Sequence, residues 1–231
     1  MEEAVRQGAH VERCFFLAEA MDGELRAALM RAGAALHPVT EPVLRSLAET
    51  AAPQGLVAVV RRREWALDEL LEGPAPLLVV LDGVQEPGNV GTILRAAWAA
   101  GAQGAVFLPG TADPYQGKAI RASAGALFRV RHTWHGDPIG LMERLQARGF
   151  GLWVAEAAGG VPPDEVDLTG PVALVLGSEA RGASAGVRRL ARALTIPMVG
   201  GAESLNVAMA GAILLYERTR QLGWLKAGQT G

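Results

Sequence analysis

Polar side chains that could hold a phosphodiester and a ribose follow apolar, strand-like runs in this chain. The run 77–81 leads into a glycine-containing loop, where Asn89 precedes Arg95 by roughly two helical turns. A guanidinium binds phosphate through paired N–H donors, so Asn89 and Arg95 together could hold a phosphodiester and its ribose. Taken singly, Asn89 is typical of a helix N-cap and Arg95 of a surface arginine.

Two further polar loops lie in the last third of the chain. Glu179 follows one buried apolar run, and Ser204 and Asn206 follow the next. Singly they have ordinary explanations, a solvated carboxylate for Glu179 and helix capping for Ser204. All of them fall at the carboxyl ends of predicted strands, where open α/β folds bind ligands. The loops that begin at Gly177 and Gly200 therefore predict a cofactor site.

Several other chemistries are disfavoured by their missing motifs. The first loop lacks both the G-x-G-x-x-G fingerprint of dinucleotide folds and the Gly-Lys-Ser/Thr of a P-loop, which argues against NAD and ATP. His132 and His135 have no cysteine or carboxylate in ligand register, so no metal is expected. No Ser, His and Asp set lies in the strand-turn-helix context of a hydrolase.

Charge and composition set further limits. The net charge of -2 argues against binding nucleic acid through bulk charge, but two windows of the sequence are basic and contain no acid. These windows contain Lys118, Arg121, Arg129 and Arg131 in the first and Arg181, Arg188, Arg189 and Arg192 in the second. Solvated helix faces explain such clusters as well as RNA contacts do.

The chain is expected to be soluble and cytoplasmic, without a membrane segment. Its apolar runs are far shorter than a membrane span, and its acidic start does not resemble a secretory signal. Cys14 is the only cysteine, which excludes an internal disulfide, and a small buried side chain is its simplest explanation.

The elements that must position the polar side chains alternate between strands and helices. Strands are predicted at 77–81, 105–108, 127–130, 152–155, 171–176 and 194–198, and helices at 88–100, 115–123, 138–147, 184–192 and 204–221. This alternation predicts an α/β fold with a mainly parallel sheet and helices on both faces.

A smaller α/β unit is predicted at 1–66, followed by a linker at 67–76 that is charged or contains proline and glycine. Within the unit, a helix is expected between Asp22 and Gly33, and a buried strand at 55–60. The larger unit is predicted at 77–231.

Three ordered segments resemble the motifs of SpoU-type RNA 2'-O-ribose methyltransferases of the SPOUT class. The segments are 81–97, 174–182 and 196–208, and 114–125 also fits. The resemblance covers about residues 77–222. Residues 1–66 resemble, more loosely, the small L30e-like RNA substrate-binding domain often fused to this family, shortened at its amino end.

The resemblance implies a C-terminal trefoil knot and S-adenosylmethionine bound by main-chain groups. It also implies a homodimer with the final helix at the interface, and Val207, Met209, Ile213 and Leu214 fit that role as well as they fit an internal packing face. The resemblance also implies a role for particular residues. Around the cofactor it places Gly177, Ile196, Met198 and Leu205, and it implies that Arg95 activates the ribose hydroxyl. The residues implied to orient Arg95 and the ribose are Asn89, Glu179, Ser204 and Asn206, and those implied to contact the RNA are Lys118 and Arg121.

The resemblance implies methylation of an RNA ribose. Ribosomal RNA, 23S RNA in particular, is expected because the fused small domain is typical of members that act on ribosomal RNA. A transfer RNA 2'-O-methyltransferase, a noncatalytic RNA-binding protein of the same fold and an enzyme that methylates an RNA base are the alternatives. The pairing of Asn89 with Arg95 favours ribose over base.

Overall fold

The computed structural model describes residues 2–48, 53–73 and 76–223. The chain divides into two compact units, 1–64 and 65–231. No helix in the described ranges combines the length and the apolar character needed to cross a membrane.

The first unit is a three-stranded sheet with helices packed on it. Its elements are α1 (Glu2–Arg6), β1 (Val11–Phe16), α2 (Gly23–Arg31), β2 (Ala35–Pro38), α3 (Glu41–Leu47) and β3 (Leu56–Val60), with sheet order β2-β1-β3. The helix expected between Asp22 and Gly33 is α2, and Asp22 caps it by accepting a hydrogen bond from the Leu25 amide at 2.7 Å. Cys14 lies in the small core with Val11 and Leu29, and burial raises the pKa of its thiol.

The second unit contains a six-stranded sheet in the order β6-β5-β4-β8-β7-β9. Its strands are β4 (Leu77–Asp82), β5 (Gly104–Phe107), β6 (Arg131–Trp134), β7 (Gly151–Ala155), β8 (Val172–Gly177) and β9 (Arg192–Leu194). Neighbouring strands all run parallel. The carboxyl ends of all six strands therefore lie at one edge of the sheet, and the loops that follow them meet there.

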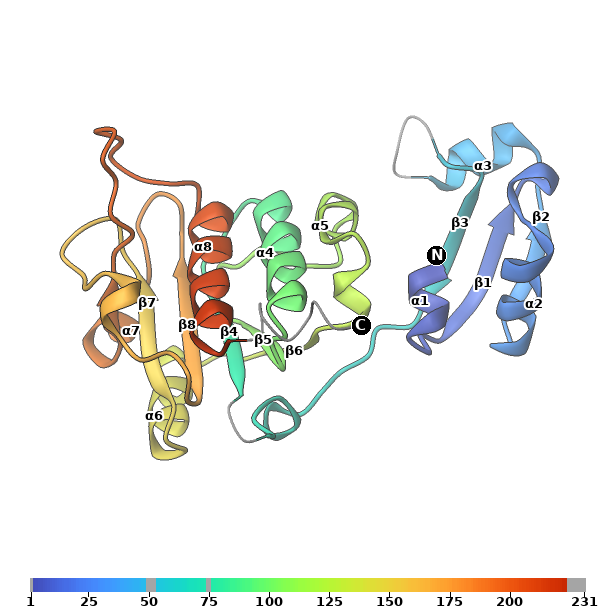
Figure 1. Ribbon diagram of the computed structural model, residues 1–231. Coiled ribbons are helices and arrows are strands. Elements are labelled where there is room, and N and C mark those ends of the chain that lie inside the picture. The colour runs from blue at the N-terminus through green and yellow to red at the C-terminus, as the bar shows by residue number, and fades with distance from the viewer. Residues whose placement is uncertain (1, 49–52, 74–75, 224–231) are drawn as a thin grey trace. The chain divides into compact units, whose positions relative to one another are not determined.

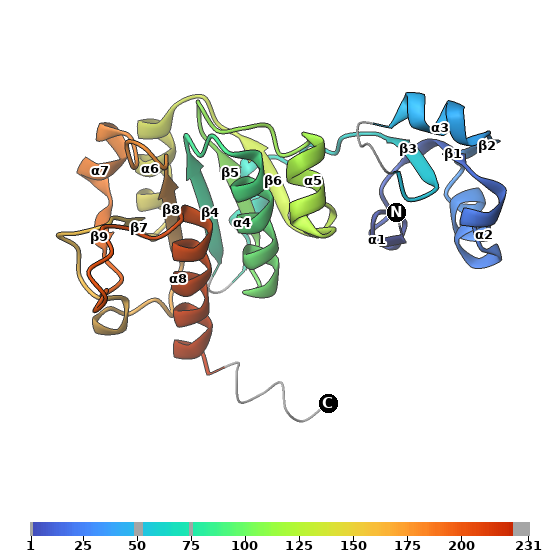
Figure 2. The same cartoon turned by 90° about the horizontal axis from the view of Figure 1, so that it is seen from above.

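Helices cover both faces of this sheet, as predicted (Figures 1 and 2). One face carries α4 (Pro87–Ala99), α5 (Gly117–Ser123) and α8 (Val207–Gln221), and the other carries α6 (Pro138–Ala147) and α7 (Ala185–Leu190). Alternate residues of β4 serve the two cores: Val79 packs under α4, and Val80 packs under α6. Both faces of a central parallel strand are buried, which is why β4 and β8 are continuous apolar runs.

The prediction of a strand at 127–130 is wrong. Ala126–Phe128 form a 3-10 helix, and the strand is Arg131–Trp134. Leu127 and Val130 are buried as neighbours three positions apart on a turn, not as alternate strand residues. The strand itself lies at the sheet edge, where His132 is the one buried residue of its four, so its sequence is mostly polar.

Other elements differ from prediction in their bounds or in their burial. The strand expected at 194–198 is Arg192–Leu194, and the final helix begins at Val207 because Asn206 caps it. The strand expected to be buried at 55–60 is at a sheet edge and leaves Val59 46% exposed. Within the range expected as a linker, Leu67 and Leu70 are buried in the core under α6.

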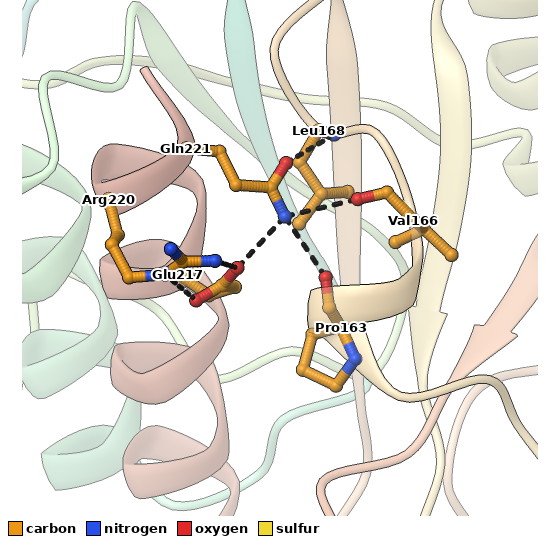
Figure 3. Close-up of polar contacts among 6 residues, drawn as sticks. All are labelled: Pro163, Val166, Leu168, Glu217, Arg220 and Gln221. Carbon is orange, nitrogen blue, oxygen red and sulfur yellow. Dashed lines mark hydrogen bonds and ion pairs between the residues drawn. The ribbon is translucent and has the colours of Figure 1, made fainter. Parts of the chain in front are cut away.

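Gln221 joins the end of α8 to the segment between β7 and β8 through several hydrogen bonds (Figure 3). Its amide nitrogen donates to the carbonyl oxygens of Pro163 at 3.1 Å and Val166 at 3.0 Å, and its amide oxygen accepts from the Leu168 N–H at 2.8 Å. Glu217, one turn earlier, accepts a third bond from the same nitrogen at 2.9 Å. The last helix is thus held against backbone more than fifty residues away in sequence.

Candidate active site at the carboxyl edge of the sheet

A cavity of about 490 Å³ lies at the carboxyl edge of the sheet, beside the ends of β7, β8 and β9. Its lining includes Gly177, Ile196, Met198 and Leu205, the four residues expected around a cofactor, and Glu179, Ser204 and Asn206, three of those expected to orient the ribose. The structure therefore brings together two segments that were predicted to form one site. Their roles stay predictions.

Glu179 is positioned by a tight loop after β8. Ser178 and Gly182 exchange two backbone hydrogen bonds, at 3.0 and 2.8 Å, and Gly182 has a φ of +67°, which a glycine adopts without strain. The loop is anchored to β4 because the Ser184 N–H donates to the buried carboxylate of Asp82 at 2.6 Å. Glu179 is left exposed at the tip, facing the start of α4.

A chain of side-chain hydrogen bonds joins the three polar segments. The Asn89 Nδ2 donates to Glu179 Oε1 at 2.8 Å, and the Asn206 Nδ2 donates to Asn89 Oδ1 at 3.1 Å. These partners are 90 and 117 residues apart in sequence. Asn206 Oδ1 caps α8 by accepting from the Ala208 and Met209 N–H groups at 3.0 and 3.2 Å.

The capping bonds of Asn206 fix the orientation of both side-chain amides, those of Asn206 and Asn89. Because the Asn206 oxygen must face the helix N–H groups, its nitrogen faces Asn89 and can only donate. The Asn89 oxygen therefore accepts, and its nitrogen donates to Glu179. The interpretation of Asn89 as an N-cap is wrong: Glu86 caps α4 instead, accepting from the Gly88 N–H at 2.9 Å.

Glu179 is held in its charged form. Partial burial raises the pKa of this carboxyl, but the hydrogen bond from Asn89 and bonds from the backbone, including the Gln85 N–H, outweigh burial, so the pKa lies below its ordinary value. A carboxylate that is charged at neutral pH and still exposed can accept a hydrogen bond from an incoming hydroxyl.

Arg95 is not among the residues that line the cavity. It is exposed on α4, and within the described part of the chain its guanidinium forms no ion pair. The structure thus brings Asn89, Glu179, Ser204 and Asn206 together and leaves Arg95 on the neighbouring helix surface. Its predicted role remains a prediction.

Glu156 and Arg188 line the cavity and were missed by sequence reasoning. Arg188 Nε donates to Glu156 Oε1 at 2.7 Å, and its Nη2 donates to the Arg181 carbonyl at 2.7 Å, so the pair joins the end of β7 to the loop after β8. The signal available was position, because Glu156 directly follows a predicted strand at the same sheet edge. Arg188 was one of eight residues in the basic windows, with nothing to single it out.

The cavity fits the S-adenosylmethionine implied by the resemblance. Ile196, Met198, Leu205 and Leu214 give it an apolar wall for a purine, and Glu156 gives it a carboxylate for hydroxyl or ammonium groups. The Ser178 hydroxyl in the wall is buried without a hydrogen-bond partner. A Cβ on Gly177 would collide with the backbone of Gly182 and Ala183, so the loop can close against β8 only over a glycine.

The predicted RNA-contacting residues lie on α5. Lys118 Nζ pairs with Glu86 Oε1 at 2.8 Å across the start of α4, and Arg121 is exposed. His132 is buried and His135 half-buried, and no three His, Cys, Asp or Glu side chains gather as metal ligands among the described residues. A second cavity, of about 480 Å³, lies between α1 and α2 of the first unit, far in sequence from the polar segments.

Two family models match the chain. The model described as the SpoU rRNA Methylase family matches residues 76–216, and the model described as RNA 2'-O ribose methyltransferase substrate binding matches residues 1–66. Among curated relatives, the 23S rRNA (guanosine-2'-O-)-methyltransferase RlmB of Ralstonia nicotianae is 36% identical over 91% of this chain and 88% of its own length. The 23S rRNA (guanosine(2553)-2'-O)-methyltransferase RlmP of Bacillus subtilis is 33% identical over 81% of this chain and 73% of its own.

Solved structures agree with these matches. The SpoU methyltransferase AviRb from Streptomyces viridochromogenes, in complex with the cofactor AdoMet, superposes with a TM-score of 0.83 at 31% identity, covering 95% of this chain and 86% of that one. An AdoMet-bound rRNA methyltransferase from Sinorhizobium meliloti gives a TM-score of 0.84 at 29% identity, covering 96% and 84%.

Proposed function

Because the chain belongs to the SpoU rRNA methylase family, we propose that it transfers a methyl group from S-adenosylmethionine to a ribose 2'-hydroxyl of 23S ribosomal RNA. The observation that carries this proposal is the hydrogen-bonded chain from Asn206 through Asn89 to Glu179, which lies beside a cavity of suitable size. Such a substrate also places the protein in the cytoplasm, where ribosomal RNA is assembled.

The bound cofactor supplies a methyl group on a positively charged sulfur. The chain's own task is to hold the ribose hydroxyl in line with that methyl group, and positioning of this kind can supply several kcal/mol or more of the barrier reduction. Gly177, Ile196, Met198 and Leu205 hold the cofactor in the cavity. Asn89, Glu179, Ser204 and Asn206 orient the ribose: Glu179, Ser204 and Asn206 line the cavity, and Asn89 hydrogen-bonds to Glu179 and Asn206.

Arg95 acts on the RNA as a cation. A guanidinium keeps its proton at ordinary pH, so Arg95 does not remove the hydroxyl proton. That proton passes to water as the oxygen–methyl bond forms and the sulfur–methyl bond of the cofactor breaks. It binds the adjacent phosphate and stabilises the negative charge that develops on the attacking oxygen. Lys118 and Arg121 add RNA contacts on α5, the next helix along the sheet face.

The chain forms a homodimer through α8. Of the four residues expected at the interface, Leu214 is in the core and Val207 is half-buried, whereas Met209 is 56% exposed and Ile213 is 39% exposed. Tyr216 continues the same helix face and is 57% exposed. These three side chains, spaced by four and three residues, form the interface.

The segment between β9 and α8 passes through an earlier loop and closes a trefoil knot. Support comes from the topology: β9 is at the edge of the sheet, and α8 packs against α4 and β8 near its middle, so residues 195–206 must return across the ends of two strands. An experimental density map that traces 195–206 around the loop and not through it would refute the knot.

The first unit binds the RNA substrate, which the description of its family model supports. A chain lacking 1–64 is then expected to retain its affinity for S-adenosylmethionine and to lose affinity for long RNA. Loss of cofactor affinity in that truncated chain would instead give the first unit a structural role.

Methylation mapping tests the activity. Purified 23S ribosomal RNA, transfer RNA and a DNA of matching sequence are incubated with the chain and radiolabelled S-adenosylmethionine, and the products are digested to nucleosides. A 2'-O-methylated nucleoside from 23S RNA alone supports the proposal. A methylated base refutes the ribose assignment, label in transfer RNA refutes the substrate, and absence of label with intact cofactor binding favours a noncatalytic RNA-binding protein.

A further inference from the structure

Trp134 is a large aromatic side chain exposed at the carboxyl ends of the strands, where the candidate site also lies. It is the last residue of β6 and is 45% exposed. Backbone pairing places Leu81, Phe107 and Trp134 in one row across β4, β5 and β6. At about 4.8 Å per strand, Trp134 is about 10 Å from the end of β4, and the loop after β4 leads to Asn89.

The indole ring is held by other aromatic rings. Tyr115 stacks on it at 6.1 Å between centroids with an interplanar angle of 19°, Phe107 contacts it at 5.3 Å, and His132 meets it edge-on at 5.9 Å. Trp134 is thus pre-positioned, and a ligand that packs on its exposed surface need not immobilise it.

The support beneath the indole is itself fixed by hydrogen bonds. His132 lies 2.8 Å from the Val130 carbonyl through Nδ1 and 2.8 Å from the Tyr115 hydroxyl through Nε2. Burial lowers the pKa of His132, so the ring is neutral at pH 7. Because a carbonyl only accepts, Nδ1 carries the proton and Nε2 accepts from the Tyr115 hydroxyl.

The surroundings of Trp134 in sequence suit a polyanion. Residues 114–136 contain four cationic side chains and no Asp or Glu: Lys118, Arg121, Arg129 and Arg131. Arg121 is exposed on α5, six residues after Tyr115 in sequence, and forms no ion pair within the described residues. In the folded chain Lys118 pairs with Glu86, and Arg131 pairs with Glu72. An aromatic surface together with a cation such as Arg121 is the combination with which proteins bind unpaired nucleotides.

We propose that Trp134 is a stacking platform for an unpaired base of the RNA substrate, a few nucleotides from the ribose held at Asn89 and Glu179. The proposal rests on the proposed function and deepens it, because it requires the RNA beside the target to be single-stranded. The faces of paired bases are covered by their neighbours in a duplex, whereas bases in loops can unstack onto an aromatic side chain.

The first test separates stacking from apolar contact. Trp134→Leu keeps an apolar side chain without a ring, and Trp134→Phe keeps a smaller ring. We expect Trp134→Leu to raise the KM for 23S RNA on the order of 10-fold and Trp134→Phe to raise it less. The kcat at saturating RNA and the Kd for S-adenosylmethionine are expected to stay at wild-type values. Equal losses in both variants, or a lost cofactor affinity, would overturn the proposal in favour of a packing role.

The second test does not depend on methyl transfer. A single-stranded oligoadenylate is titrated into the full chain without cofactor while tryptophan fluorescence is followed. We expect quenching in the wild type that disappears in Trp134→Phe, and weaker binding by a duplex of the same length. Unchanged RNA affinity in Trp134→Leu, as a protein-binding surface would give, refutes the platform. If the wild type lacks methyl transfer yet shows this quenching, only the proposed function fails.

Discussion

Asn89 uses both ends of its amide, donating to Glu179 and accepting from Asn206. Removing the amide therefore breaks both links of the chain at once. We expect Asn89→Ala to lower kcat on the order of 100-fold through loss of positioning, with the Kd for S-adenosylmethionine changed less than about threefold. The matched control is Thr92→Ala, one turn further along α4, whose exposed hydroxyl donates to the Gly88 carbonyl of the same helix. Equal kinetics for both variants would exclude Asn89 from the site.

Asn89→Ala is also expected to change how kcat/KM depends on pH. Hydrogen bonds hold the pKa of Glu179 below the ordinary value of 4.5, and the bond from Asn89 is the largest of those that lower it. A carboxyl with a depressed pKa contributes its stabilisation above the ordinary pKa and loses it as pH falls through the depressed one. The acid limb of kcat/KM controlled by Glu179 therefore lies below pH 4.5 in the wild type and moves to higher pH in Asn89→Ala. A limb that stays in place would show that the charge of Glu179 is not required.

Substitution of Arg95 tests whether its positive charge stabilises the charge that develops on the attacking oxygen. Because it lies outside the cavity lining, Arg95→Ala is expected to leave the Kd for S-adenosylmethionine unchanged. We expect kcat to fall on the order of 100- to 1,000-fold, the usual effect of losing a group that stabilises developing charge. Arg95→Lys keeps the charge without the paired donors and should retain partial activity. Turnover at the wild-type rate in Arg95→Ala would remove Arg95 from the mechanism.

Among the elements, the central strands of the larger sheet were predicted, and the edge strand β6 was not. β4 and β8 are covered on both faces, so their sequences are apolar throughout and identify them. β6 is at the sheet edge, where Arg131 and Trp134 are exposed, so its sequence lacks the apolar run that identifies a buried strand. The sheet edge at which the polar side chains gather was also predictable, since parallel strands all end there.

The site partners were harder to predict because they come from distant elements. Asn89 has the local pattern of an N-cap, and only a contact with Glu179, 90 residues away, gives it a different role. The pairing of Glu156 with Arg188 likewise depends on β7 lying beside β8. A single sequence contains no trace of such pairings apart from a family resemblance.

The attachment of α8 gives a stability prediction at the scale of one element. Gln221→Leu leaves the Leu168 N–H and the carbonyls of Pro163 and Val166 without the partner that Figure 3 shows. We expect the free energy of unfolding to fall by about 2 kcal/mol, measured by urea denaturation. The control is Arg220→Ala, whose exposed guanidinium bonds Glu217 on the same helix and should change stability by less than about 1 kcal/mol. Equal effects would show that the partly buried bonds of Gln221 contribute no more than an exposed ion pair.

For the whole molecule, the exposed face of α8 predicts assembly. Met209, Ile213 and Tyr216 lie on one side of a helix whose other side packs into the core through Leu214 and Leu215. Exposed side chains of this size in one row are typical of a surface that another copy covers.

Ile213→Asp tests that assembly, because a dimer would bury the new carboxylate without a partner. We expect the dimer to weaken by about 3 kcal/mol, roughly 100-fold in its dissociation constant, measured by sedimentation or light scattering. Ile139→Asp is the matched control: Ile139 is 40% exposed against 39% for Ile213, but it lies on α6, on the opposite face of the sheet. A wild-type chain that is monomeric at micromolar concentration, or an equal loss in both variants, would exclude α8 as the interface.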